Sequence, residues 1–424
     1  MFVLRAAPLG ALCVFFVASA MGRPTAADTP TLPMPPPGLQ AAIHELWDVN
    51  PQVQAADASR RAAQERASAA GQPVYNPSLQ LDAENADVNR RTAGASLTLD
   101  AFGKREARIT QGDAEVRSQE AAYVLARRDV ARDWLKAWSS VAYTREQSAL
   151  GEQRLALMRR FDALAGQRLK VGDISSTERD LAGLALGEAQ VEQSSLEARQ
   201  ADAVAALAAL GGDPDGKVPA RFVALPPVPA AISPVPNSDR PELQQAQAEQ
   251  ERADAAVTVA DRNRRPDPTI SLTGGEVRSG PRTDRVVGVS ISMPIPVLNS
   301  GRYEVSAARA DADAAYATRR AAELRSDARL TQARATYVAL RAASENFRQG
   351  RAGAFDERAA LLDKLWQAGE ISTSDYLVQL KQSLDTALSG IALEDQTWQA
   401  WFDYLAAAGR LTDWVTGNLK ESSP

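Results

Sequence analysis

The side chains best placed for chemistry are carboxylates that recur beside two glycines. Residues 172–175 read Gly-Asp-Ile-Ser, and residues 369–372 read Gly-Glu-Ile-Ser. A further acid lies six residues past each glycine, Glu178 in the first case and Asp375 in the second. Carboxylates can attract cations, but they are also favoured in the first turn of a helix by the helix dipole. Acids at a turn between helices, rather than in a cleft, do not indicate catalysis.

Other kinds of reactive site have no support in the sequence. Cys13 and His44 are the only cysteine and histidine, so a Cys/His metal site cannot be assembled within one chain. There is no phosphate-binding loop and no nucleophile with a paired histidine. The net charge is −5 and no basic run stands out, which argues against nucleic acid as a partner. We therefore expect no enzyme activity, no cofactor and no bound metal.

The N-terminus is predicted to be a cleaved secretory signal over residues 1–20. Arg5 supplies the positive charge, residues 9–17 the apolar core, and residues 18–20 (Ala-Ser-Ala) the cleavage site, with a second candidate site after Ala27. The apolar core is too short to span a bilayer as a helix. Cys13 lies inside it and is expected to be discarded, since its flanking residues make a poor lipidation site.

Two segments alternate with the period of a β-strand, and each is predicted to be a β-hairpin, over residues 77–101 and 268–295. One face of these strands is apolar and the other is polar. The apolar positions are Leu79, Leu81, Leu97, Leu99, Ile270, Leu272, Val287, Val289 and Ile291. The polar positions are Gln80, Asp82, Glu84, Ser96, Thr98 and Ser290.

Long helices follow each hairpin. Residues 103–169 contain no proline and carry apolar residues every seven positions, which predicts a helix roughly 100 Å long, packed as in a coiled coil. A return helix is expected over 177–210. The second half repeats this order, with a long helix over 301–367 and a return helix over 375–408.

The chain is thus an internal duplication, with repeats over 21–210 and 238–410, a Pro/Gly-rich linker at 211–237 and a tail at 411–424. The glycines of the two turns are 197 residues apart, and Gly103 and Gly301, which open the long helices, are 198 apart. The predicted fold class is mainly α with a small β part.

Four amphipathic strands cannot close a barrel alone. An open sheet with an exposed apolar face and free edges is prone to aggregate in water. If the apolar face meets lipid, every backbone group must be paired, so other subunits must supply the missing strands. The polar residues would then line a wet lumen. The alternative is a pair of soluble hairpins that cap a helical rod.

The hairpin-then-long-helix duplication and the paired Gly-acid-Ile-Ser turns resemble the TolC outer-membrane factor family. Residues 293–304 (Met-Pro-Ile-Pro-Val-Leu-Asn-Ser-Gly-Arg-Tyr-Glu) resemble its heavy-metal efflux branch, the CzcC/CusC-like proteins. The resemblance implies a homotrimer in the outer membrane, with a twelve-stranded barrel continued by a periplasmic α-helical tunnel. It also implies a periplasmic adaptor and an inner-membrane pump of the RND type as partners.

The resemblance also implies roles at the tunnel tip. The tip turns would contact the adaptor through Val171, Gly172, Asp173, Ala368, Gly369 and Glu370. Asp375 would face the closed entrance, with Glu178 as its counterpart, and three-fold symmetry would turn each into an acidic ring of the kind found in cation pores. Val378 occupies the position where the family can carry a second acid, so a double ring is in doubt. The alternative for both acids is that they are first-turn helix residues favoured by the helix dipole.

The predicted function is that of a passive outer-membrane conduit. It would be the outer-membrane component of a tripartite pump that exports heavy-metal cations. A channel of the same family for drugs or secreted polypeptides is a second hypothesis. A periplasmic coiled-coil scaffold without a pore is a third, from another class.

Overall fold

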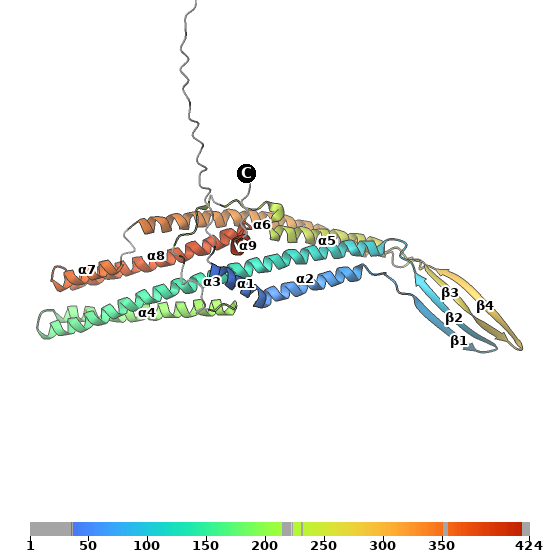
Figure 1. The fold of residues 1–424 in the computed structure, drawn as a ribbon, viewed down its shortest axis with the longest axis horizontal. Coiled ribbons are helices and arrows are strands. Elements are labelled where there is room, and N and C mark those ends of the chain that lie inside the picture. Colours follow the sequence, from blue (N-terminus) through green and yellow to red (C-terminus); the bar gives the residue numbers. More distant parts are fainter. Residues whose placement is uncertain are drawn as a thin grey trace, which may run out of the picture.

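The computed structural model is an elongated helical rod with a β-sheet at one end (Figure 1). It describes residue 35, residues 37–213, residue 222, and residues 224–229, 232–350 and 355–417. The predicted signal peptide and part of the predicted linker lie outside the described residues.

The two halves of the chain repeat the same order of elements. The first half contains α1 (Pro37–Val49), α2 (Pro51–Ala70), β1 (Ser78–Asn85), β2 (Val88–Thr98), α3 (Lys104–Lys170) and α4 (Ser176–Ala209). The second half contains a short 3-10 turn (Asn237–Asp239), α5 (Pro241–Asn263), β3 (Thr269–Ser279), β4 (Arg282–Ser292), α6 (Arg302–Gln349), α7 (Phe355–Gln367), α8 (Thr373–Ala407) and α9 (Leu411–Thr416). The mainly helical fold class is confirmed.

Every strand continues a helix, so sheet and helices share one lateral order. The strands pair antiparallel in the order β1-β2-β3-β4. Beside the sheet, α2 contacts α3, α3 contacts α5 and α5 contacts α6. Toward the far end, α3 contacts α4 and α8, and α8 contacts α7. The long helix α3 therefore runs through the whole rod and joins both halves (Figure 1).

Aromatic residues form the main core at the middle of the rod. Trp134 and Trp138 from α3 pack with Trp401 and Phe402 from α8, and α1 and α9 cover them on one side. A second core near the far end joins α3, α4, α7 and α8. The burial of these large aromatic rings away from water is the main contribution to the stability of the packed helices.

The structure corrects one prediction about the long helices. The sequence predicted a single helix over 301–367, but α6 ends at Gln349 and α7 begins at Phe355. Gly350 has extended backbone angles (φ −74°, ψ 159°), and its amide still bonds to the Asn346 carbonyl at 3.1 Å, which ends the helix. The predicted tail over 411–424 likewise contains a short helix, α9.

Two glycines inside the α3–α4 pair have opposite environments. A Cβ at Gly151 would lie 2.6 Å from Leu196 Cδ1 and would clash with the buried Gln193, whereas a Cβ at Gly187 would meet nothing within 4 Å. Gly151 therefore permits the close approach of the two helices. Gly187 has no such packing role, and a glycine inside a helix is less stable there than an alanine would be.

We expect Gly151→Ala to destabilise the protein by about 1–3 kcal/mol through overpacking. Gly187→Ala, the matched control, should stabilise it by up to about 1 kcal/mol, because alanine is the better helix former. Denaturant unfolding of both variants checks this. Equal effects of the two substitutions would contradict the close packing at Gly151.

Candidate functional site

The two helix hairpins end in turns of the same geometry at the far end of the rod. Gly172 and Gly369 have left-handed backbone angles, with φ of 79° and 74°. The amide of Asp173 bonds to the Arg168 carbonyl at 2.9 Å, and that of Glu370 bonds to the Leu365 carbonyl at 3.0 Å. This is the Schellman arrangement, in which only glycine enters the left-handed position without strain.

A serine caps the helix that follows each turn. Ser175 Oγ accepts a hydrogen bond from the Glu178 amide at 3.2 Å, and the Glu178 carboxylate accepts one from the Ser175 amide at 2.8 Å, which completes a capping box. Hydrogen bonds from the Ser175 amide and hydroxyl lower the pKa of Glu178. In the second hairpin, Ser372 Oγ accepts from the Asp375 amide at 3.1 Å and donates to the Asp375 carboxylate at 2.7 Å.

Both acids predicted for the entrance are therefore engaged in helix caps. Asp375 is exposed and Glu178 is half-buried. The tip residue Val171 is 80% exposed, which leaves an apolar side chain free at the end of the first turn. Both acids lie in the first turn of a helix, where the helix dipole favours them, and a ring of acids would need further copies of the chain.

An aromatic cluster joins the two hairpins just behind their turns. Phe161 from α3 lies 4.5 Å from Trp366 of α7 and 5.0 Å from Tyr376 of α8, measured between ring centroids. The guanidinium of Arg168 lies 4.5 Å from the Trp366 ring centroid, a cation–π contact. The Tyr376 hydroxyl is buried, and burial raises its pKa, so it stays neutral. The cluster holds the tips of the two repeats together.

An ionic contact connects the hairpins further along. Lys381 of α8 forms an ion pair with Glu188 of α4, and Arg154 of α3 lies 3.7 Å from the same carboxylate. They flank a small hollow of about 230 Å³ between α4 and α8, lined also by Leu184 and Val378, which are 70% and 64% exposed. No sequence motif predicts these residues, because the partners lie in different repeats.

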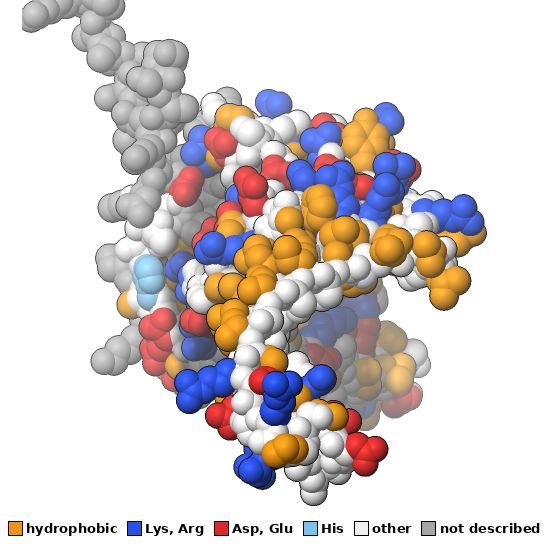
Figure 2. All heavy atoms as spheres, turned by 90° about the vertical axis from the view of Figure 1, so that its right-hand side faces the viewer, with side chains coloured by type: hydrophobic (Ala, Val, Ile, Leu, Met, Phe, Trp, Pro, Cys, Tyr) orange, Lys and Arg blue, Asp and Glu red, His pale blue; other side chains and the backbone are white. Residues whose placement is uncertain are grey.

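The strand register shows which of the predicted apolar and polar residues share a face of the sheet. Directly paired residues of antiparallel strands share a face, and Leu79 pairs with Ala95, Leu97 with Ile270, and Leu272 with Val289. Ser96 pairs with Ser271, which pairs with Ser290 on the opposite face. Figure 2 shows hydrophobic side chains gathered along the curved sheet. The predicted apolar and polar sets thus fall on opposite faces, with Leu99 just beyond the end of β2.

Both lateral edges of the structure are open. β1 and β4 each pair on one side only. The helices that continue these strands, α2 and α6, expose alanine-rich faces at heptad-like spacing, away from their neighbours α3 and α5. On α6 the exposed positions are Ala307, Ala310, Ala314, Ala317, Leu324 and Ala328, and on α2 they are Ala55, Ala58 and Ala69. Faces of this kind suit close packing of another helix.

A buried ion pair fastens the junction between sheet and helices. Lys104 Nζ at the start of α3 lies 2.9 Å from the Asp267 carboxylate before β3, with only 9% and 1% of the two side chains exposed. Tyr75 donates a hydrogen bond to the same carboxylate at 2.8 Å. The contact therefore joins the two repeats where strands become helices.

The rod of duplicated hairpins with an open amphipathic sheet has the fold of outer-membrane channels. The structure superposes on the Campylobacter jejuni CmeC outer membrane channel with a TM-score of 0.76, over 92% of this chain and 87% of that one, at 14% identity. It superposes on CusC with a TM-score of 0.68, over 88% of this chain and 92% of that one, at 14% identity.

Residues 42–213 match the outer membrane efflux protein family. The family resemblance read from the sequence is confirmed, and so is the expectation that the chain is not an enzyme. The cobalt-zinc-cadmium resistance protein CzcC of Cupriavidus metallidurans is 26% identical over 244 residues, 56% of this chain and 58% of that protein. The chain spans about three fifths of the length of the curated relatives that it matches.

Among the described helices, none is both long and apolar enough to cross a bilayer. In the same part of the chain, no group of three or more His, Cys, Asp or Glu side chains is arranged to hold a metal ion.

We expect Asp267→Ala to destabilise the protein by about 3–5 kcal/mol, because it leaves the Lys104 ammonium buried without its partner. Chemical denaturation in detergent measures this. Glu251→Ala, which breaks the largely exposed pair with Arg117, is the control and should cost under about 1 kcal/mol. Replacing both partners, as Lys104→Met with Asp267→Leu, should restore much of the loss. Equal losses for Asp267→Ala and the control would contradict a structural role for the pair.

Proposed function

We propose that three copies of this chain form an outer-membrane efflux channel. The observation that carries the proposal is the sheet with two open edges, an apolar face and a polar face. Four strands from each copy make a twelve-stranded barrel in which β1 of one copy pairs with β4 of the next. Leu81 and Val289 then face lipid, and Gln80 and Ser290 face the lumen.

The helices extend the barrel into a periplasmic tunnel. The exposed alanine faces of α2 and α6 meet between neighbouring copies, as the strands do, so the same seam runs from barrel to tunnel. The hairpin turns around Gly172 and Gly369 form the tip. A periplasmic adaptor docks there through the exposed Val171 and its neighbours, and an inner-membrane RND pump delivers the cargo. The predicted N-terminal signal exports the chain across the inner membrane, and the apolar face of the barrel then inserts into the outer membrane.

Heavy-metal cations are the proposed cargo. The likeness to the cobalt-zinc-cadmium resistance protein supports this, as does the resemblance of residues 293–304 to the metal branch. The cations pass hydrated, and the pump upstream sets the selectivity. Drugs or secreted polypeptides are the second candidate cargo, and loss of metal resistance in a deletion strain, restored by the gene, separates the two.

A pair of variants on one strand tests the channel. Leu81→Arg places a charge on the lipid face, at a cost of about 2–4 kcal/mol near the bilayer midplane, and should reduce trimers in the outer membrane. Gln80→Arg, its neighbour on the lumen face, should assemble normally and change the conductance in planar bilayers. Trimers in mild detergent and a steady conductance of the unaltered protein are expected. A monomer that is soluble without detergent would support the scaffold alternative and overturn the proposal.

A second pair separates charge from capping at the entrance. Asp375→Asn removes the charge but keeps an oxygen that can accept from Ser372, whereas Asp375→Ala removes both. If an acidic ring binds cations, both variants should need a several-fold higher divalent-cation concentration for half-block of the conductance. An effect of Asp375→Ala alone would assign the residue to helix capping, and no effect of either would reject the ring.

A further inference from the structure

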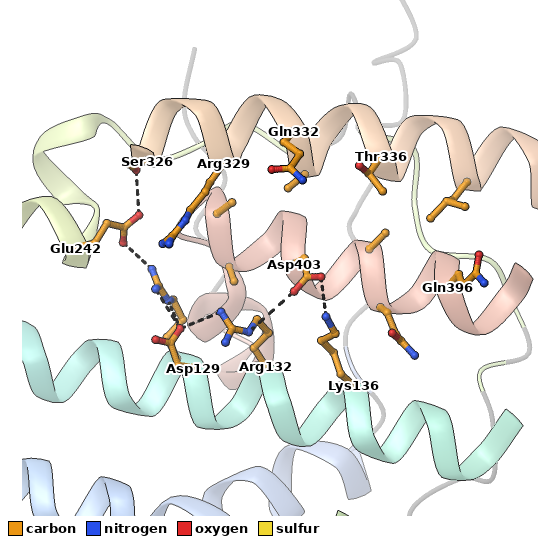
Figure 3. A pocket seen from close by; sticks show the side chains of 17 residues that line it. Asp129, Arg132, Lys136, Glu242, Ser326, Arg329, Gln332, Thr336, Gln396 and Asp403 are labelled. Carbon is orange, nitrogen blue, oxygen red and sulfur yellow. Dashed lines mark hydrogen bonds and ion pairs between the residues drawn. The ribbon is translucent and has the colours of Figure 1, made fainter. Parts of the chain in front are cut away.

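A polar cleft of about 670 Å³ lies at the middle of the rod, between α3, α6 and α8 and beside the start of α5 (Figure 3). Volumes of this size are typical of small-molecule sites. Three helices each present a polar stripe to it, although they come from both repeats.

The wall formed by α3 is a ladder of paired charges. Arg128 binds Glu242 of α5 at 2.6 Å, and Lys136 binds Asp403 of α8 at 2.8 Å. Arg132 lies between them, 2.8 Å from Asp133, 3.3 Å from Asp129 and 4.0 Å from Asp403. Because these groups satisfy one another, this wall is fixed before any ligand arrives.

The wall formed by α6 is different. Arg329, Gln332 and Thr336 lie on one face of the helix and project toward the cleft (Figure 3), and Gln396 of α8 joins them. Within the described part of the chain, none of these four side chains forms a hydrogen bond or an ion pair. Four cationic side chains line the cleft, and three of them, Arg128, Arg132 and Lys136, are held in ion pairs, so Arg329 is the lining cation whose charge is left for a ligand.

The charged wall of the cleft lies on the side of α3 opposite the aromatic core, although Ala400 and Ala406 of that core also line the cleft. Arg132 and Lys136 stand two residues on either side of the buried Trp134, a rotation of roughly 200° around α3. Asp403 stands in the same relation to Trp401 on α8. The core side carries the additional helices α1 and α9, which would obstruct a tunnel. On the proposed trimer, the cleft therefore faces the lumen.

We propose that this cleft binds a small, hydroxylated monocarboxylate, with Arg329 as its charge partner. A planar guanidinium pairs with a carboxylate through two parallel hydrogen bonds. Gln332, Thr336 and Gln396 supply donors and acceptors for hydroxyl groups. The nearby carboxylates of Asp129, Glu242 and Asp403 disfavour multiply charged anions such as phosphate. The lumen position rests on the proposed channel, but the binding site does not.

Isothermal titration calorimetry of the full chain in detergent tests the site with gluconate as the probe. We expect saturable binding with one site per chain, weakened about tenfold or more in Arg329→Gln. Arg325→Gln is the matched control, because Arg325 is also exposed on α6, one turn earlier, and does not line the cleft. It should bind as the unaltered protein does.

Sorbitol, a polyol without a carboxylate, and inorganic phosphate complete the test, and neither should compete with gluconate. Absence of saturable gluconate binding, or equal binding by Arg329→Gln, would overturn the site. Binding of phosphate as tight as that of gluconate would overturn the assignment to carboxylates, and equal binding of sorbitol would remove the role of charge. Calorimetry needs no open pore. A failure of the channel proposal would therefore leave gluconate binding intact, whereas a failure of the cleft proposal would abolish it.

Discussion

The unpaired edges of the four-stranded sheet are the constraint on which the rest of the structure depends. An edge strand presents free amides and carbonyls, and an apolar face next to such an edge cannot be left in water or in lipid without a partner. The helices inherit the same problem, because α2 and α6 continue the two edge strands and expose alanine faces along their length. The strand order β1-β2-β3-β4 therefore determines which strands and which helices are left without a neighbour on one side.

In the proposed trimer, the internal duplication makes the seam within one chain and the seam between neighbouring chains join corresponding elements. The inner seam joins β2 and α3 to β3 and α5, and the Lys104–Asp267 pair fastens it. At the proposed seam between chains, Arg302 follows Gly301 as Lys104 follows Gly103. On the other side of that seam, Asn76-Pro77 precedes β1 as Asp267-Pro268 precedes β3. The carboxylate is thus present in one seam and replaced by an amide in the other. In the proposed trimer, the ion pair therefore stabilises the junction within each copy, and the junction between copies has no counterpart of this carboxylate.

The sequence predicted those features that depend on local pattern. Alternation placed Leu79 and Gln80 on opposite faces, and glycine with a following acid placed both turns, because backbone sterics and capping act over a few residues. The break after Gln349 was missed, since Gly350 is also compatible with a helix interior. Contacts between repeats, such as Lys381 with Glu188, were missed as well. They depend on how two long helices are rotated against each other, which no local pattern records.

Charge at the tip is coupled to the stability of the helices that carry it. Hydrogen bonds from Ser175 lower the pKa of Glu178 in the folded chain, so the stabilisation that the cap contributes is present above the unfolded pKa of a glutamate. It is lost as the pH falls through the lower, folded value. Acidification therefore discharges the carboxylate and weakens the start of α4 in the same step. Protonation of Glu178 weakens its capping box, which links the charge at this position to the rigidity of the turn.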